Sequence, residues 1–144
     1  MKIIKAKKKD LKEIAKLMLE EFSKPPWKHN ESIREVLKSI NFYFKIGEIY
    51  FIKINKEIMG IIVFKIEQYW EGEVIIIEDL VVKDKFKKQN IEKGLMKFVE
   101  SYAKKKKIRR TLFTTNKKSK SVSFYKKIGY KIKKNVISMF KDLK

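Results

Sequence analysis

Two adjacent carboxylates, Glu78 and Asp79, interrupt an otherwise apolar run from Val74 to Val82. A short run rich in Val and Ile is typical of a strand buried on both faces. Desolvation in such a strand raises the pKa of a carboxyl toward neutrality, which suits a general base. Successive side chains of a strand point to opposite faces, so we expect at most one of the two carboxylates to face a given site. Glu78 is our candidate base, with a solvent-facing or lysine-paired carboxylate as the alternative. Asp79 is expected to be a structural or edge carboxylate.

A basic turn, Lys83 to Gln89, follows this strand. Apolar residues then recur at the spacing of an amphipathic helix, at Ile91, Leu95, Phe98, Val99 and Tyr102. The N-terminus of a helix presents unpaired N–H groups and the positive end of its dipole. Strand, turn and helix together therefore predict a site for an anion, in particular a phosphate.

Length and composition limit the classes of protein to consider. A chain of 144 residues suits one domain, expected over residues 1–144, and 44% apolar residues do not indicate disorder. The absence of cysteine excludes disulfides, thiolate metal sites and cysteine nucleophiles. His29 is the one histidine of the sequence, which argues against a metal site built from histidines. No apolar run reaches the ~18 residues of a membrane span, and the first residues lack the apolar segment of a secretory signal. We therefore expect a cytoplasmic protein.

The formal net charge of +20 comes mainly from lysine. A lysine coat can be solvated surface alone. The same charge also attracts polyanions: nucleic acid, an acidic protein or a phosphorylated cofactor. Composition does not separate these readings.

The remaining sequence predicts the elements around the central unit. A first strand at Ile3–Ile4 precedes two helices, one carrying Leu11 to Phe22 and one carrying Ile33 to Ile40. Residues 49–54 and 58–66 alternate as a hairpin, in which Gly60 marks a bulge or a close backbone approach. Further elements are expected as a strand over 108–115, a helix ending at Gly129, and final strands over 130–132 and 136–140. The expected fold is α/β, with a mixed, mostly antiparallel central sheet.

Trp27 and His29 lie in the loop that follows Pro25 and Pro26. Trp27 either anchors this loop on the core or forms one wall of a substrate pocket. His29 is expected at the surface or in a hydrogen bond rather than in catalysis.

Three stretches resemble the GNAT superfamily of N-acetyltransferases. IMGIIVFKI is similar to the hairpin strand of that family, IEDLVVKDKFKKQNIEKGLM to its acetyl-CoA motif, and SVSFYKKIGY to its late helix with Phe-Tyr and Gly-aromatic steps. IEDLVV also resembles the diamine and polyamine acetyltransferases. The resemblance implies a GNAT-like acyl-CoA N-acyltransferase fold with about four helices. It further implies acetyl-CoA as co-substrate, no metal, and an amine-bearing small molecule or protein as acceptor, in a monomer or homodimer.

The resemblance also assigns roles to residues. Strand contacts to the acyl donor fall on Leu80, Val81 and Val82. Pyrophosphate contacts fall on Lys87, Lys88, Gln89, Asn90, Ile91 and Glu92, where the family has glycines and this chain has none. A solvated lysine turn is the other reading of that stretch. Tyr125 matches the catalytic acid of the family, and a core aromatic is the alternative.

Two functions follow from these observations. The first is an N-acetyltransferase that moves acetyl directly from acetyl-CoA to an amine. The second is a non-catalytic module on the same fold that binds nucleic acid or an acidic partner. A cationic acceptor would require acidic lining, which Glu48, Glu67, Glu71, Glu73 and Glu78 could supply.

Overall fold

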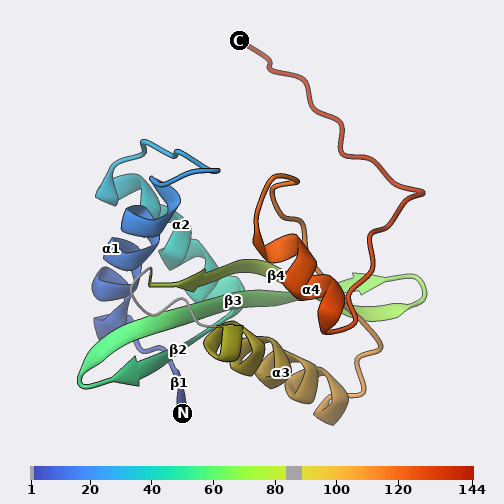
Figure 1. Cartoon of the computed structure of the whole chain (residues 1–144), viewed down its shortest axis with the longest axis horizontal. Helices are drawn as coiled ribbons and strands as arrows, with labels where there is room; N and C mark the ends of the chain where they lie inside the picture. Colours follow the sequence, from blue (N-terminus) through green and yellow to red (C-terminus); the bar gives the residue numbers. More distant parts are fainter. Residues whose placement is uncertain (1, 84–88) are drawn as a thin grey trace.

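The chain forms a sheet with helices on both faces (Figure 1). The computed structural model describes residues 2–83 and 89–144. The strands are β1 (Ile3–Lys5), β2 (Glu48–Ile54), β3 (Glu57–Tyr69), β4 (Gly72–Val82) and β5 (Thr111–Leu112). The helices are α1 (Leu11–Phe22), α2 (Ile33–Ile46), α3 (Gln89–Lys105) and α4 (Ser121–Lys127), with a 3₁₀ turn (Lys8–Asp10) before α1.

The strand order is the order of the sequence, β1-β2-β3-β4-β5. The first four strands pair antiparallel, and β4 pairs parallel with β5 over only two residues, Ile75 and Ile76. The predicted mixed, mostly antiparallel sheet is therefore confirmed. The β2–β3 hairpin turns at Asn55 and Lys56, whose φ angles of 52° and 65° match the twist of a two-residue hairpin turn.

Each face of the sheet has its own apolar core. Helices α1 and α2 cover one face, where Ile14 and Ile40 pack with Ile61 and Val63 of β3. Helix α3 covers the other face through residues at helical spacing, Ile91, Leu95, Met96, Val99 and Ala103. Tyr125 of α4 packs against this second core. The sheet that carries the site residues is thus packed against helices on both of its faces.

Gly60 explains how close α3 lies to the sheet. A Cβ at this position would lie 3.1 Å from side-chain atoms of both Ile91 and Leu95. The register between β2 and β3 also shifts beside it, between Ile52 and Lys53. Both predicted meanings of this glycine, a bulge and a close approach, are present.

A second bulge lies in β4 at Glu78. Val63 pairs with Asp79 and Phe64 with Ile77, so Glu78 is the extra residue. Because of this bulge, the side chains of β4 do not alternate strictly between the two faces of the sheet, as the sequence had suggested. Asp79 shares the α1–α2 face with its partner Val63, and Glu78 reaches Lys65 and Tyr43 on that same face. The expectation that the two carboxylates point to opposite faces is therefore wrong.

The end of the chain also departs from the prediction. The strand expected over 108–115 is reduced to β5, and residues 130–132 and 136–140 form no strand. After α4 the chain leaves the body of the molecule (Figure 1). The segment alternates as the sequence suggested, but a strand forms only where its backbone pairs with a neighbouring strand, and among the described strands none pairs with it.

Among the described helices, none combines the length and the apolar character that crossing a membrane requires.

Candidate active site

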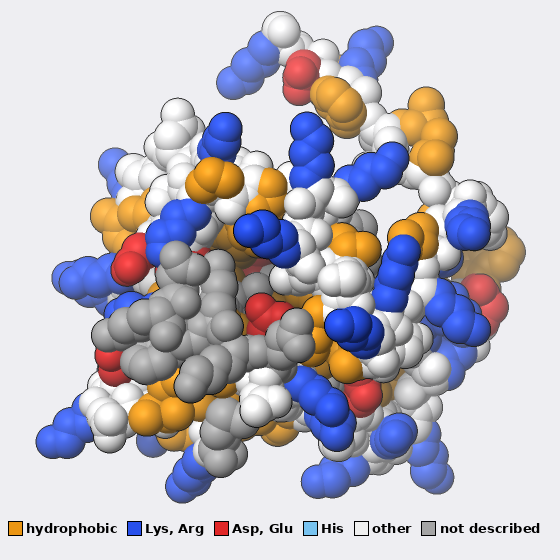
Figure 2. Space-filling view, in the orientation of Figure 1, with side chains coloured by type: hydrophobic (Ala, Val, Ile, Leu, Met, Phe, Trp, Pro, Cys, Tyr) orange, Lys and Arg blue, Asp and Glu red, His pale blue; other side chains and the backbone are white. Residues whose placement is uncertain are grey.

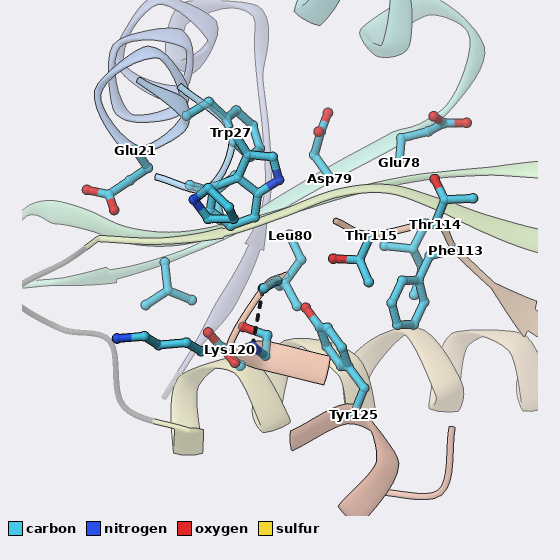
Figure 3. A pocket seen from close by; sticks show the side chains of 18 of the residues that line it. Glu21, Trp27, Glu78, Asp79, Leu80, Phe113, Thr114, Thr115, Lys120 and Tyr125 are labelled. Carbon is cyan, nitrogen blue, oxygen red and sulfur yellow. Dashed lines mark hydrogen bonds between the residues drawn. The ribbon is translucent and has the colours of Figure 1, made fainter. Parts of the chain in front are cut away.

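A crevice opens where β4 and β5 separate. The parallel pairing ends at Ile76 and Leu112, and beyond it the two strands border a cavity of about 530 Å³. The lining includes the predicted residues Trp27, Glu78, Leu80, Val81, Val82, Glu92 and Tyr125. Residues far apart in the sequence therefore meet at one splayed sheet edge, which Figure 3 shows from close by.

The backbone of β4 presents N–H groups to this crevice. The amide of Lys83 donates to the carbonyl of Met59 on β3, and the amide of Ile75 donates to Arg110 on the β5 side. Because successive amides of a strand alternate in direction, the amides of Val82 and Leu80 point away from β3 and toward the opening. They are the donors that the sequence resemblance assigned to the acyl group.

The crevice connects the two faces of the sheet. Figure 3 shows Trp27, Asp79 and Glu78 on one side of β4, with Tyr125 and Lys120 on the other. A molecule held on the α3–α4 side can thus meet a second molecule held under the α1–α2 loop. This arrangement suits a direct transfer between two substrates.

The carboxyl of Asp79 has a strongly perturbed pKa. Burial raises its pKa from 3.8 to about 7, the negative charge of Glu78 adds to the rise, and His29 opposes it. A carboxyl with this pKa exchanges a proton near neutral pH, as a general base must. The sequence assigned the role of base to Glu78, the preceding residue of the same strand, and that assignment remains a prediction.

Glu78 has partners of its own. Its carboxylate lies 3.3 Å from the Lys65 ammonium and accepts a hydrogen bond of 3.2 Å from the Tyr43 hydroxyl. Lys65 also pairs with Glu67 at 3.1 Å. The lysine-paired reading of Glu78 therefore describes its contacts, while its role as a base stays a prediction.

Tyr125 rises from α4 toward β4. Its ring packs edge-on to Phe113 with the centroids 4.7 Å apart, and its hydroxyl end points toward Leu80 in Figure 3. Burial raises the pKa of Tyr125 above the ordinary value of 10.0, with smaller contributions from Glu92 and Tyr130. The phenol is therefore a protonated hydrogen-bond donor throughout the neutral range.

The first turn of α3 borders the same crevice. Gln89 begins the helix, and Asn90, Ile91 and Glu92 follow in its first turn, with Glu92 lining the cavity. Lys87 and Lys88 lie outside the described residues. The predicted pyrophosphate amides are thus placed at a helix N-terminus, where the dipole favours an anion.

Trp27 packs on Phe22 and also lines the crevice, and its role as a wall of a substrate pocket stays a prediction. Its ring packs edge-on to Phe22 with a centroid distance of 5.5 Å, and it also lines the crevice. His29 lies 3.1 Å from the carboxylate of Glu31 in the same loop. The loop therefore forms a wall of the cavity opposite β5.

Acidic side chains gather on the described part of the crevice wall. Lys and Arg side chains are spread over the part of the face in Figure 2 that the structure describes. Among the residues that the structure describes, those lining the cavity include four carboxylates, Glu21, Glu78, Asp79 and Glu92, and two lysines, Lys118 and Lys120. Of the acidic residues proposed from the sequence, only Glu78 belongs to this set.

The sequence reasoning missed several lining residues. Asp79 was set aside because the bulge has no sequence signature. Lys118 and Lys120 lie in the NKKSKS segment before α4, whose clustered lysines and serines were visible but had no assigned place. Among the described residues, no group of three or more His, Asp or Glu is arranged to hold a metal ion.

Comparison with known proteins agrees with this geometry. The model of the acetyltransferase (GNAT) family matches residues 11–130, and the chain belongs to that family. None of the curated proteins gives a significant sequence match.

Solved structures share the fold at low sequence identity. A possible acetyltransferase from Clostridium difficile 630 superposes with a TM-score of 0.86 and 14% identity, covering 99% of this chain and 98% of the other. Aminoglycoside N-acetyltransferase AAC(6')-Iy, solved with CoA, gives a TM-score of 0.81 and 15% identity over 97% and 93% of the two chains. The enzyme AAC(6')-IG from Acinetobacter haemolyticus gives 0.81 and 14% over 100% of both. The five-stranded sheet with its helices is thus a GNAT fold.

Proposed function

We propose that this acetyltransferase moves an acetyl group from acetyl-CoA directly to the amine of a small molecule or protein. The observation that carries the proposal is the crevice through the β4–β5 edge, with a proton-accepting carboxyl on one side and a tyrosine hydroxyl on the other. The family and a structural neighbour solved with CoA support the donor.

The donor binds on the α3–α4 side. The amides of Asn90, Ile91 and Glu92 meet the pyrophosphate at the helix N-terminus, as they do in the resemblance. The Glu92 carboxylate repels a phosphate there, and Lys118 and Lys120, which line the same cavity, offset that repulsion. The pantetheine arm then follows the open edge of β4, which aims the thioester carbonyl at Leu80 and Val82.

The transfer forms one bond and breaks another. The amine nitrogen attacks the thioester carbon, the C–N bond forms, the C–S bond breaks, and CoA leaves as a thiolate. Negative charge that develops on the carbonyl oxygen is stabilised by the amides of Leu80 and Val82. The protonated amine gives its excess proton to Asp79 on the acceptor side. This assignment competes with Glu78, the base expected from the sequence.

Tyr125 serves the leaving group. Because its pKa is raised, full transfer of its proton to a thiolate, the conjugate base of a stronger acid, is unfavourable. We therefore assign it an O–H···S hydrogen bond that stabilises the thiolate, with the final proton supplied from water. Tyr125, which the resemblance predicts as the catalytic acid, thus still acts at the step in which the thiolate leaves.

The acceptor enters beside Trp27, Glu78 and Asp79. Carboxylates at this mouth attract a cationic amine despite the charge of the whole chain. Neighbours named as aminoglycoside acetyltransferases support an acceptor of this kind. We propose a small polycation as the first class to test, with a peptide amino terminus as the second.

The test has two parts. Saturating acetyl-CoA should raise the melting temperature by several degrees, because a ligand that binds only the native state stabilises it by about 2.7 kcal/mol at 100 times its Kd. Mass spectrometry should then show acetylation of spermidine, an aminoglycoside or a peptide. Salt-sensitive retention on heparin, combined with no thermal shift, would support the non-catalytic module instead.

A further inference from the structure

Helix α3 and the segment that follows it expose an almost purely basic surface. Between residues 93 and 110, every solvent-exposed residue except Ser101 is Lys or Arg. The apolar residues of α3 face the sheet instead. Figure 1 places α3 along one side of the molecule, and Figure 2 shows Lys and Arg side chains around its C-terminal end. We call the exposed cations the basic stripe: Lys93, Lys97, Lys104 to Lys107, Arg109 and Arg110.

The basic stripe runs along the helix and continues past its end. Lys93, Lys97 and Lys104 are spaced so that they lie on one side of α3. With a rise of about 1.5 Å per residue, the stripe covers about 16 Å of the helix between Lys93 and Lys104. The chain then continues it to Arg109 and Arg110. The stripe is therefore an extended line of positive charge.

The described carboxylates leave most of this charge without a counter-charge. Among the described residues, the ion pairs include one member of the stripe, Arg109, whose guanidinium lies 3.8 Å from the Glu71 carboxylate. Glu100 is the acidic residue of segment 93–110, and its carboxylate accepts a hydrogen bond of 3.1 Å from Tyr130. Like charges four residues apart on a helix repel one another. A bound polyanion would relieve that repulsion, and release of its counterions would favour binding.

A solvated lysine coat gives a different pattern elsewhere in the protein. On β1 and β3, lysines lie beside carboxylates: Lys5 is 3.2 Å from Glu48, and Lys65 is 3.3 Å from Glu78. Helix α1 exposes lysines and glutamates together: Lys12, Glu13, Lys16 and Glu20. Exposed acidic side chains thus accompany the lysines of α1 but not those of the stripe, which favours a role of the stripe in binding an anion.

A fully exposed tryptophan lies at one end of the basic stripe. Trp70 is at the tip of the β3–β4 hairpin, and the carboxylate of its neighbour Glu71 is 3.8 Å from Arg109. An aromatic ring beside a row of cations is the arrangement with which proteins stack a base while they hold the adjacent phosphates. The ring therefore favours, among polyanions, one that carries bases.

We propose that the basic stripe and Trp70 bind single-stranded nucleic acid, with phosphates along the stripe and a base stacked on the Trp70 ring. A protein partner fits this surface poorly, because lysine is depleted in protein–protein interfaces. A membrane also fits poorly, because an interfacial helix inserts its apolar face, and that face of α3 is in the core. No residue of the stripe is among the described residues that line the crevice, so the proposal does not rest on acetyl transfer.

Fluorescence anisotropy with labelled single-stranded RNA and DNA oligonucleotides tests the stripe. On a plot of log K against log salt concentration, the slope should be about −0.7 per phosphate contacted. Lys97→Ala with Lys104→Ala should weaken binding about tenfold or more at low salt and reduce the steepness of that slope by about 1.4. The matched control, Lys12→Ala with Lys16→Ala, loses the same charge from α1 on the other face of the sheet and should bind within about twofold of the parent.

Trp70 supplies a separate readout. Trp70→Ala should weaken oligonucleotide binding about tenfold without changing the salt slope, and should leave binding to heparin, which has no bases, unchanged. Phe42→Ala, at an exposed site on α2, is its control and should bind as the parent does. Saturating CoA should not displace the oligonucleotide, because the described stripe lies outside the crevice.

Four results would overturn the proposal. They are equal losses in the lysine variants of α3 and α1, displacement of the oligonucleotide by CoA, no effect of Trp70→Ala, or tighter binding to phosphatidylserine vesicles than to either oligonucleotide. None of these readouts depends on acetyl transfer.

Discussion

Replacing Asp79 by Asn should change stability and activity in opposite directions. The pKa of Asp79 is raised from 3.8 to about 7, chiefly because burial disfavours its charge. A shift of this size corresponds to roughly 4 kcal/mol of lost folding free energy once the carboxyl is fully ionised. Asparagine has nearly the same shape and no charge, so Asp79→Asn should recover much of that amount above pH 8.

The sign follows from proton binding. At a pH well below 3.8 the carboxyl is protonated in both the folded and the unfolded chain, and the variant should match the parent. Between pH 4 and 7 only the unfolded chain ionises readily, so the parent loses stability as the pH rises. Urea denaturation of both proteins at several pH values measures the difference. A difference that stays constant from pH 4 to 9 would refute the argument that partial burial disfavours the charge of Asp79.

Activity provides the second readout. For the parent, kcat/KM should rise with pH and level off above about 7. Asp79→Asn should remove this limb and lower the plateau by about 10²–10⁴-fold. The matched control is Glu78→Gln, which removes the neighbouring charge and should move the limb to lower pH without abolishing it. Loss of the limb in Glu78→Gln, with the limb retained in Asp79→Asn, would return the role of base to Glu78.

Further predictions concern the donor side and the packing of α3. Tyr125→Phe should lower kcat about 10- to 100-fold with little change in the KM for acetyl-CoA. In the parent protein, kcat should not fall between pH 8 and 9, because the raised pKa of Tyr125 keeps its hydroxyl protonated there. Lys120→Ala should raise the acetyl-CoA dissociation constant several-fold, most strongly at low salt, whereas Lys97→Ala on the exposed side of α3 should not. Isothermal titration at two salt concentrations compares the two lysine variants, and equal effects would contradict the placement of Lys120. Gly60→Ala should lower the free energy of unfolding by about 1–3 kcal/mol, a limited loss because the side chains of α3 that its Cβ would meet can shift. Gly47→Ala should lower it further, because its Cβ would lie 2.6 Å from a backbone oxygen of β3, which cannot shift as easily. Denaturant midpoints test this order.

Local patterns predicted the elements that bury a regular face. The alternation around Asn55–Lys56 gave a hairpin, and the 3.6-residue spacing from Ile91 to Tyr102 gave α3. In both cases the pattern that predicts the element lies within one short segment of the sequence. The element could therefore be predicted without knowing which distant residues pack against it. The end of the chain behaved differently, because residues 136–140 have a strand pattern without a strand partner in their own sheet. A sequence shows that a strand is possible, while the pairing edge decides whether it forms.

The candidate site was predicted in part for a similar reason. Glu78, Tyr125 and Trp27 were placed by type and by motif, and they do line one crevice. Asp79 was assigned to the wrong face because strict alternation was assumed for the whole strand. A bulge depends on the register with β3, which no single strand contains.

The bulge at Glu78 connects the two halves of the proposed site. It lies two residues beyond Ile76, the last residue of β4 that pairs with β5. Because a bulge bends a strand and increases its local twist, β4 turns away from β5 just where the crevice begins. The same extra residue places Glu78 and Asp79 together on the α1–α2 face. One irregularity thus separates β4 from β5 where the crevice begins and places the partly buried Asp79 carboxyl beside Glu78 at its wall.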